Sequence, residues 1–213
     1  MQRLIFIDTE TSCFAEEIGA NTFNRPSLNE NNEVIYPHIC QISWIVCSTT
    51  GEEIISKNHI IKPNGFTITE SATSVHGITN EFAIANGEDI KDAIDELIED
   101  IGLYDCYKIC GHNVKFDIHM IEAEALRLGY TGFFESLLKF HYADTCVNKE
   151  IMRYVGALNK LGRIKRPKLS ELYFKLFGRL FENAHDSLAD IKATKECYFE
   201  CVKKNLLVQH IYD

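Results

Sequence analysis

The sequence predicts an α/β fold, in which apolar strands alternate with amphipathic helices around one sheet. The run "LIFI" at residues 4–7 is typical of a strand buried on both faces. Residues 89–102 place apolar side chains at helical spacing, with acids on the opposite face. The strand-like "YKIC" at 107–110 is followed by a helical pattern at 116–128, which is the order expected of such a sheet.

The other elements follow in chain order. Residues 14–38 are polar, rich in Asn and without a clear period, which predicts a long loop. The stretches 39–47 and 52–63 are predicted strands, joined near Thr50 and Gly51 as a hairpin beside the first strand.

The second half of the chain predicts more helix than strand. Gly129 is expected to close the helix that ends at Leu128. We expect a strand over 137–144, ending near Asp144, and helices over 147–155, 168–177 and 187–204, with Asp186 as the N-cap of the last.

Length and composition bound the class of protein. With 213 residues, 46% of them apolar, the chain predicts a single domain over 1–213. No run of 18 apolar residues is present, so we expect no membrane span and a cytoplasmic location. The eight cysteines are interpreted as reduced thiols, and a zinc site built from Cys106, Cys110, Cys197 and Cys201 is a weaker alternative because these residues lie on apolar faces.

The net charge of -9 is a sum over segments of opposite charge. Residues 81–105 hold nine acids and one base, whereas residues 139–179 hold ten bases and three acids. The basic run 160–168 is interpreted as a contact for a phosphate backbone, with a plain balancing of the acidic helix as the alternative.

Asp8 and Glu10 follow the most apolar strand and, as residues i and i+2, point to the same face. If the two carboxylates lie about 4 Å apart in an effective dielectric near 20, they repel each other by roughly 4 kcal/mol. A bound cation or a proton on one of them must therefore offset this repulsion. Asp117 and Asp190 lie on helix stripes that face the core. Four such acids favour Mg²⁺ or Mn²⁺ over zinc, although a strand end that simply meets solvent is the alternative for the first two.

Each of the two later acids has a His five residues before it. His185 precedes Asp190 and is a candidate general base, with a capping or loop role as the alternative. His112 precedes Asp117 and is equally compatible with a structural hydrogen-bonding role.

The motifs "FIDTET", "GHNVKFD" and "HDSLAD", in that order, resemble the three signatures of the DEDDh exonucleases, the family of the epsilon-type proofreading subunits. The stretches "PHICQISWIV", "HGIT" and "KLSELYFKLFG" add to the resemblance. It implies a ribonuclease H-like fold, a mixed five-stranded sheet with an antiparallel hairpin and parallel strands, flanked by helices. Asp186, four residues before Asp190, disfavours the related subclass with Tyr in place of His.

The resemblance also implies roles for residues. Asp8, Glu10 and Asp190 would bind one metal ion, Asp8 would also bind a second, Asp117 would hold that one through water, and His185 would be the general base. The two ions, Mg²⁺ or Mn²⁺, would assist hydrolysis that releases nucleoside 5'-monophosphates. The residues placed near the terminal nucleotide are Thr9, Thr11, His76, Asn113 and Phe116. The loop 14–38 and the "TETSC" sequence depart from the family pattern.

Three functions remain open at this point. The first is a metal-dependent 3'-5' exonuclease on single-stranded or frayed DNA ends, in proofreading or repair, with a DNA polymerase as a candidate partner. The second is the same chemistry on RNA or short oligoribonucleotides. The third is a catalytically inactive module that binds nucleic acid.

Overall fold

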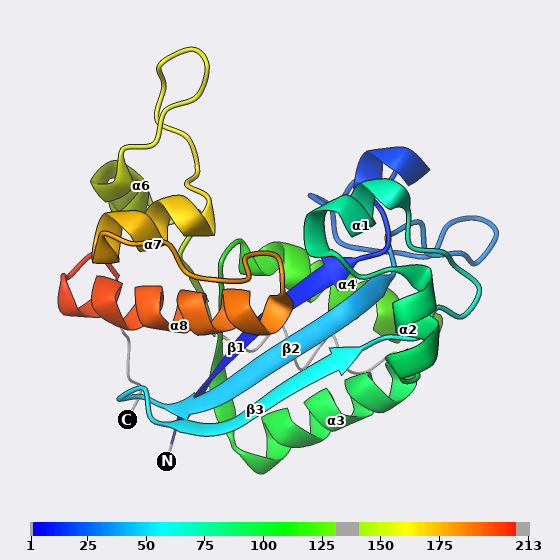
Figure 1. Ribbon diagram of the computed structural model, residues 1–213. Helices are drawn as coiled ribbons and strands as arrows, with labels where there is room; N and C mark the ends of the chain where they lie inside the picture. The colour runs from blue at the N-terminus through cyan, green and yellow to red at the C-terminus, as the bar shows by residue number, and fades with distance from the viewer. Residues whose placement is uncertain (1, 131–140, 208–213) are drawn as a thin grey trace.

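The computed structural model describes residues 2–130 and 141–207 (Figure 1). Its centre is a five-stranded sheet in the order β3-β2-β1-β4-β5, with β1 in the middle. The first three strands pair antiparallel, and β4 and β5 continue the sheet parallel to β1. The strands are β1 (Arg3–Thr11), β2 (Ile39–Ser48), β3 (Glu53–Ile60), β4 (Cys106–Gly111) and β5 (His141–Asp144). The mixed sheet and the hairpin confirm the predicted fold class.

The first strand is longer than predicted. It runs from Arg3 to Thr11 because β2 pairs with it along its whole length, so Asp8 and Glu10 lie within the strand and not beyond it. The register shifts only between Glu10 and Thr11. The two acids are therefore held by a rigid strand, which is a firmer support than the strand end that the sequence predicted.

Two helical layers cover the sheet, as the sides of β1 show. Ile5 and Ile7 pack on one face against α3 (Ile90–Leu103) and α4 (Val114–Arg127). Leu4 and Phe6 pack on the other face against α7 (Leu169–Phe177) and α8 (Ser187–Lys203). Because side chains alternate along a strand, Asp8 and Glu10 belong to the α8 side and Thr9 to the α4 side.

The helices agree closely with the predicted ranges. Helix α6 (Lys149–Val155) precedes α7, and Gly178 follows α7 in the left-handed conformation. Asp186 caps α8 as predicted, since its side chain accepts a hydrogen bond from the backbone N–H of Ala189. The expected strand 137–144 is seen from His141 onward, and its earlier residues lie outside the described part of the chain.

Two short helices were not predicted. Helix α1 (Glu70–His76) and helix α2 (Asn80–Asn86) begin after Thr69 and Thr79, whose hydroxyls accept hydrogen bonds from backbone N–H groups in the first turn. The capping threonines were the available signal. With seven residues each, these helices are too short to show a helical period clearly.

The long loop 14–38 is confirmed as largely irregular, with one 3-10 turn (Ala15–Ile18). It is tied to α4 at several points. His119 Nδ1 donates to the Thr22 carbonyl at 2.9 Å, Arg25 pairs with Glu122 at 2.8 Å, and Arg127 donates to the Tyr36 carbonyl at 2.5 Å. The loop is thus fastened to the same helix that carries Asp117.

The cysteines are free and buried, which agrees with their interpretation as reduced thiols. Cys197 and Cys201 lie in the core beneath α8, and Cys110 lies in the same core cluster. Within residues 2–130 and 141–207, no helix combines the length and apolar character needed to cross a membrane.

Candidate active site

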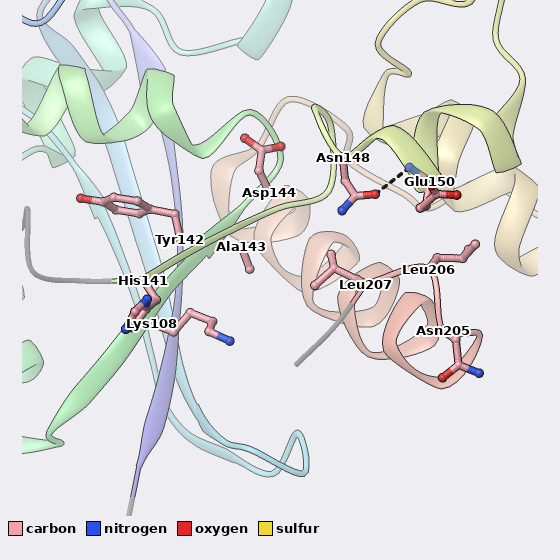
Figure 2. A pocket seen from close by; sticks show the side chains of 10 residues that line it. All are labelled: Lys108, His141, Tyr142, Ala143, Asp144, Asn148, Glu150, Asn205, Leu206 and Leu207. Carbon is pink, nitrogen blue, oxygen red and sulfur yellow. Dashed lines mark hydrogen bonds between the residues drawn. The ribbon is translucent and has the colours of Figure 1, made fainter. Parts of the chain in front are cut away.

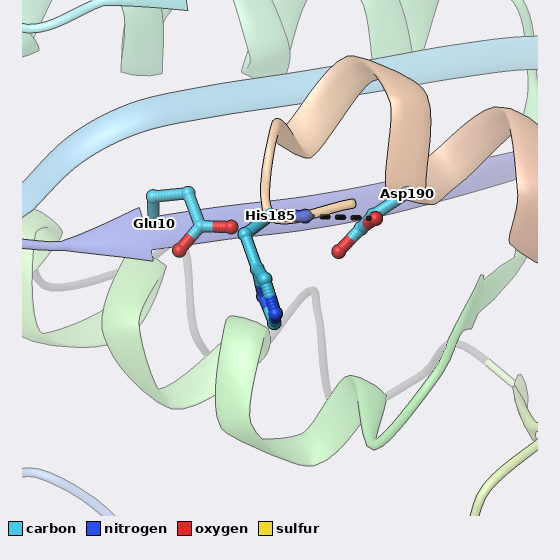
Figure 3. A group of neighbouring side chains, drawn as sticks. All are labelled: Glu10, His185 and Asp190. Atoms are coloured by element: carbon cyan, nitrogen blue, oxygen red, sulfur yellow. Dashed lines mark hydrogen bonds between the residues drawn. The ribbon is translucent and has the colours of Figure 1, made fainter. Parts of the chain in front are cut away.

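Strand β1 and the start of α8, which are distant in sequence, bring three predicted site residues together. Glu10 comes from β1, Asp190 from the first turn of α8, and His185 from the loop just before that helix (Figure 3). One ligand atom from each of these three side chains lies within 4.8 Å of the other two. The structure therefore brings Glu10, His185 and Asp190 together, and their catalytic and metal-binding roles stay predictions.

Asp117 lies on the other side of β1, at the start of α4. Its side chain is buried, and Oδ1 accepts hydrogen bonds from the Thr9 N–H at 3.0 Å and from the Thr9 hydroxyl at 2.9 Å. Thr9 thereby joins Asp117 to the strand between Asp8 and Glu10. The Thr9 hydroxyl is engaged in this bond, so the contact of Thr9 with a nucleotide stays a prediction.

The electrostatics show how closely the four carboxyls crowd. Burial raises the pKa of Asp8 well above its usual value, and the charges of Asp117, Asp190 and Glu10 raise it further. Burial is also the main cause that raises the pKa of Glu10 to about 8, with Asp190 and Asp117 adding to it. Without a cation, the site can remain compact only by keeping protons on its carboxyls.

The other two carboxyls are shifted less because they accept hydrogen bonds. Burial raises the pKa of Asp117 to about 7 against the opposing effect of the two bonds from Thr9. Burial likewise raises the pKa of Asp190 to about 6, opposed by the N–H of His185, which donates to Oδ1 at 3.3 Å. Because Asp117 and Asp190 also raise the pKa of Asp8 and of Glu10, the four groups titrate as an interacting set.

A polar network fixes the beginning of α8 on the sheet. Gln41 of β2 donates to the Asp186 carboxylate at 3.1 Å and accepts from the Ser187 N–H at 3.2 Å. Ser187 also shares a hydrogen bond with the hydroxyl of Ser43 at 2.5 Å. Gln41, Ser43 and Ser187 are buried, so this network sets where Asp190 and His185 stand relative to β1.

Thr11 and His76 form one flank of the site. His76 Nε2 lies 3.2 Å from the Thr11 carbonyl oxygen, and His76 Nδ1 accepts from the Ile78 N–H. Burial lowers the pKa of His76, and the nearby charge of His185 lowers it further. The structure thus brings these two predicted substrate residues to the end of β1, beside His185.

Asn113 and Phe116 lie at the start of α4. Asn113 begins α4 in the left-handed conformation, at φ 69°, and its N–H donates to Asp144 at 3.2 Å. Both residues line a cavity of about 600 Å³ that Thr22 and Phe23 of the long loop also border. Asp144 was not among the predicted site residues, although the sequence placed it at the end of a strand, which is where parallel-sheet sites form.

His112 has the structural role that the sequence left open. Its ring bonds to the Thr145 hydroxyl at 2.9 Å and, through Nε2, to the Pro167 carbonyl at 3.0 Å. Gly111 before it is required sterically, because a Cβ there would come within 2.7 Å of Val114. This tight turn from β4 into α4 carries Asn113 and Asp117 to the site.

A second cavity, of about 380 Å³, lies along β5 and the end of α8 (Figure 2). Lys108, Tyr142 and Leu207 are among the residues that line it. It shares Asp144 with the first cavity, but none of the predicted site residues borders it. Its position therefore separates it from the carboxylate cluster.

The chemistry of the cluster fits divalent metal ions. Within the described residues, the carboxylates of Asp8 and Glu10 accept no hydrogen bond and face no cation, and the bonds to Asp117 and Asp190 each involve only one oxygen. Oxygen donors of this kind suit Mg²⁺ or Mn²⁺, with His185 close by. The donor set therefore fits divalent cations, which would offset the repulsion among these carboxylates.

The fold is ribonuclease H-like, and comparison with known proteins places the chain within that class. Residues 5–198 match the family model RNase_T, described as "Exonuclease". Since the match covers most of the sequence, the chain belongs to this exonuclease family. Among curated proteins, no sequence matches significantly.

Solved structures of exonuclease I share the fold at low sequence identity. The E. coli enzyme in complex with a dT13 oligonucleotide is 20% identical, with a TM-score of 0.72 over 95% of this chain. The same enzyme in complex with a dA16 oligonucleotide is 18% identical, with a TM-score of 0.69 over 96% of this chain. Exonuclease I from Methylocaldum szegediense is 16% identical, with a TM-score of 0.69 over 96% of this chain. The chain spans 41% of each of those longer proteins.

Proposed function

We propose that the protein is a metal-dependent exonuclease that removes nucleotides one at a time from the 3' end of single-stranded or frayed DNA. One observation carries the proposal: ligand atoms of Glu10, His185 and Asp190 lie within 4.8 Å of one another, and Asp8, Glu10, Asp117 and Asp190 are buried so that each has a raised pKa. Family membership supplies the reaction class.

In this proposal Asp8, Glu10 and Asp190 hold one Mg²⁺ or Mn²⁺ ion. Asp8 also holds a second, together with Asp117 acting through water. Bound ions of this kind supply Lewis-acid stabilisation of the phosphoryl oxygens and of the leaving oxygen. Thr9 keeps Asp117 oriented, and the Gln41 network keeps Asp190 and His185 against β1.

His185 is proposed to take a proton from the attacking water. The water oxygen bonds to the terminal phosphorus, the bond from phosphorus to the 3' oxygen of the preceding nucleotide breaks, and that oxygen gains a proton. The products are a nucleoside 5'-monophosphate and a strand one nucleotide shorter. The exposed position of His185 leaves it open to the solvent side of the cluster, and imidazole groups exchange protons readily near neutral pH.

The terminal nucleotide is proposed to lie between the two flanks of the site. Thr11 and His76 border it on one side, and Asn113 and Phe116 on the other. Thr9, which lies between Asp8 and Glu10 on β1, is the fifth residue proposed to lie near the nucleotide. This arrangement places the sugar and base outside the carboxylates, where a single strand can enter from solvent.

DNA is proposed ahead of RNA because similar solved structures hold deoxyoligonucleotides. An exoribonuclease uses the same acids, so the substrate rests on this likeness alone. Work in proofreading or repair beside a polymerase, a cytoplasmic location and a single domain over 1–213 stay predictions.

The test uses matched 12-nucleotide DNA and RNA strands, labelled at the 5' or the 3' end, with Mg²⁺ or Mn²⁺. The proposal expects mononucleotides from the 3' end of DNA, no reaction in EDTA, and a loss of about 10³-fold in rate for Asp8→Ala. Glu33→Gln, an exposed acid on the loop 14–38, serves as the matched control and should keep the wild-type rate.

Other results would favour one of the alternative functions or refute the mechanism. If nucleotides are released faster from RNA than from DNA, RNA replaces DNA as the proposed substrate. A gel shift without cleavage in Mn²⁺ would favour the inactive binding module. Continued release of mononucleotides by a folded Asp8→Ala variant would refute the proposed mechanism.

A further inference from the structure

Two surface turns of the molecule have the same construction and opposite charge. In the acidic turn (residues 28–34) the Asn29 side chain accepts from two backbone N–H groups, and Leu28 bridges to Val34. In the basic turn (residues 158–164) the Asn159 side chain accepts from two N–H groups in the same way, and Leu158 bridges to Ile164. The first carries Glu30 and Glu33, and the second carries Lys160 and Arg163.

The basic turn is the tip of a longer projection, here called the basic finger (residues 156–168). It stands well clear of the helices around it (Figure 1, yellow loop between α6 and α7). The finger contains five basic residues and no acid. Leu161 at the tip is 79% exposed, and Lys165 near the base is paired with Glu171 at 2.7 Å.

The base of the finger is fixed beside the carboxylate cluster. Pro167 accepts a hydrogen bond through its carbonyl from His112 Nε2, at 3.0 Å, and His112 directly precedes Asn113 at the start of α4. Arg166 and Lys168, on either side of Pro167, line the same cavity of about 600 Å³ as Asn113 and Phe116. The base of the finger therefore borders the cavity that Asn113 and Phe116 line, and these are two of the residues predicted to lie near the terminal nucleotide.

We propose that the basic finger binds the sugar-phosphate backbone of the single strand upstream of its 3' end. The inference rests on the proposed function, since it needs a strand whose end lies at the carboxylates. A chain of net charge -9 with an acidic site repels a polyanion, so a concentrated positive element beside the site is needed to hold one.

The cavity also offers a surface for bases. Phe23 is 78% exposed and lines the cavity together with the half-buried Phe116. Stacking on aromatic rings contributes to the binding of single strands without sequence preference. Arg166 and Lys168 supply the positive charge at its border, so backbone and bases can be held at the same place.

The decisive experiment compares two double variants of the matched turns. Lys160→Ser with Arg163→Ser removes the charge of the basic turn, and Glu30→Ser with Glu33→Ser removes that of the acidic turn, while both keep the Asn that closes each turn. A third variant, Arg166→Ala with Lys168→Ala, changes the cavity border. Circular dichroism and thermal melting establish that each variant is folded.

Binding is measured by fluorescence anisotropy with a 5'-fluorescein 12-mer of deoxythymidine in Ca²⁺, over a range of salt. We expect Kd to rise about tenfold for each basic variant. The slope of log Kd against log salt concentration should also decrease by roughly 0.7 for each phosphate that the variant no longer binds. The acidic-turn variant should leave Kd unchanged or lower it slightly. An equal change in Kd from both turns, or no change from the basic variants, would overturn the inference.

Activity gives a second readout. The loss in kcat/KM is expected to grow with substrate length, being about tenfold larger on the 12-mer than on the p-nitrophenyl ester of thymidine 5'-monophosphate. A loss independent of length would contradict a contact upstream of the 3' end. If the wild-type protein binds the 12-mer and cleaves neither substrate, the proposed function fails, and the anisotropy still decides the role of the finger.

Discussion

Asp117 and Glu124, two of the buried acids on helix α4, have pKa values shifted in opposite directions. Asp117 and Glu124 are only 3% and 2% exposed. Burial raises the pKa of Asp117 to about 7. Burial also raises the pKa of Glu124, but His38, Arg127 and the Ile39 N–H together outweigh it and bring that pKa below its ordinary value. The difference teaches that burial alone does not mark a candidate functional acid, whereas burial without a neighbouring cation does.

The largest expected effect comes from removing the cation that Glu124 has. Arg127→Ala would leave Glu124 buried with weaker partners, and we expect the free energy of unfolding to fall by about 3 kcal/mol. For a chain of this size, that corresponds to a decrease in Tm of roughly 6–12 °C, measured by calorimetry.

Arg153→Ala is the matched control for this prediction. Arg153 pairs with Glu150 at the same i, i+3 spacing, but both side chains are exposed, so the cost should stay below about 1 kcal/mol. Equal losses from the two variants would show that the buried pair has no special weight, and the contrast within α4 would then fail.

Replacing each of the two acids by its isosteric amide tests the contrast between Asp117 and Glu124 further. In EDTA at pH 8, Asp117→Asn removes a charge that the fold does not compensate and keeps an oxygen for the two Thr9 bonds, so we expect stability to rise by roughly 1–2 kcal/mol. Glu124→Gln removes a compensated charge and should lower stability by roughly 2 kcal/mol. Urea unfolding measures both. Shifts of the same sign would break the distinction between the two acids.

The smallest expected effect is the pH dependence of the metal-free protein. The pKa values of Glu10, about 8, and Asp117, about 7, lie above their unfolded values, so the folded state keeps protons that the unfolded state releases. Stability is therefore fully present at low pH and is lost as the pH rises through 7 and 8, by about 1 kcal/mol per pH unit.

The window from pH 6.5 to 8.5 isolates this effect. The pKa values of His76 and His112 are lowered, mainly by burial, so their destabilising effect sets in only below this range. Thermal melts in EDTA should show a falling Tm across the window, a smaller slope for Glu10→Gln, and recovery with millimolar Mg²⁺. A Tm that rises with pH would contradict the raised pKa of the carboxyls.

Most of the fold could be predicted from the sequence because its strands and longer helices have clear periods. The apolar run 4–7, the helix near 89–102 and the N-cap Asp186 all lie where expected. Short helices escaped prediction because seven residues hold too few repeats to reveal a period. The length of β1 also escaped, because pairing with β2 depends on residues far along the chain.

The convergence of the acids was predictable, but their supports were not. The motifs located Asp8, Glu10, Asp117, His185 and Asp190 as one group, and the structure brings them together. The bond from Thr9 to Asp117 and the network from Gln41 to Ser187 join residues more than a hundred positions apart. No local pattern can encode such contacts, since each depends on the register and packing of distant elements.

The fastening of the loop 14–38 to α4 has an evolutionary consequence. Glu122 and Glu124 have their ionic partners in Arg25, His38 and Arg127, and two of these belong to the loop. A relative with a shorter link would leave Glu122 inside the protein without Arg25, and Glu124 with Arg127 as its remaining ionic partner. In such lineages position 122 should turn apolar at the same time as the insertion disappears, so that loop length and helix sequence are inherited as one unit.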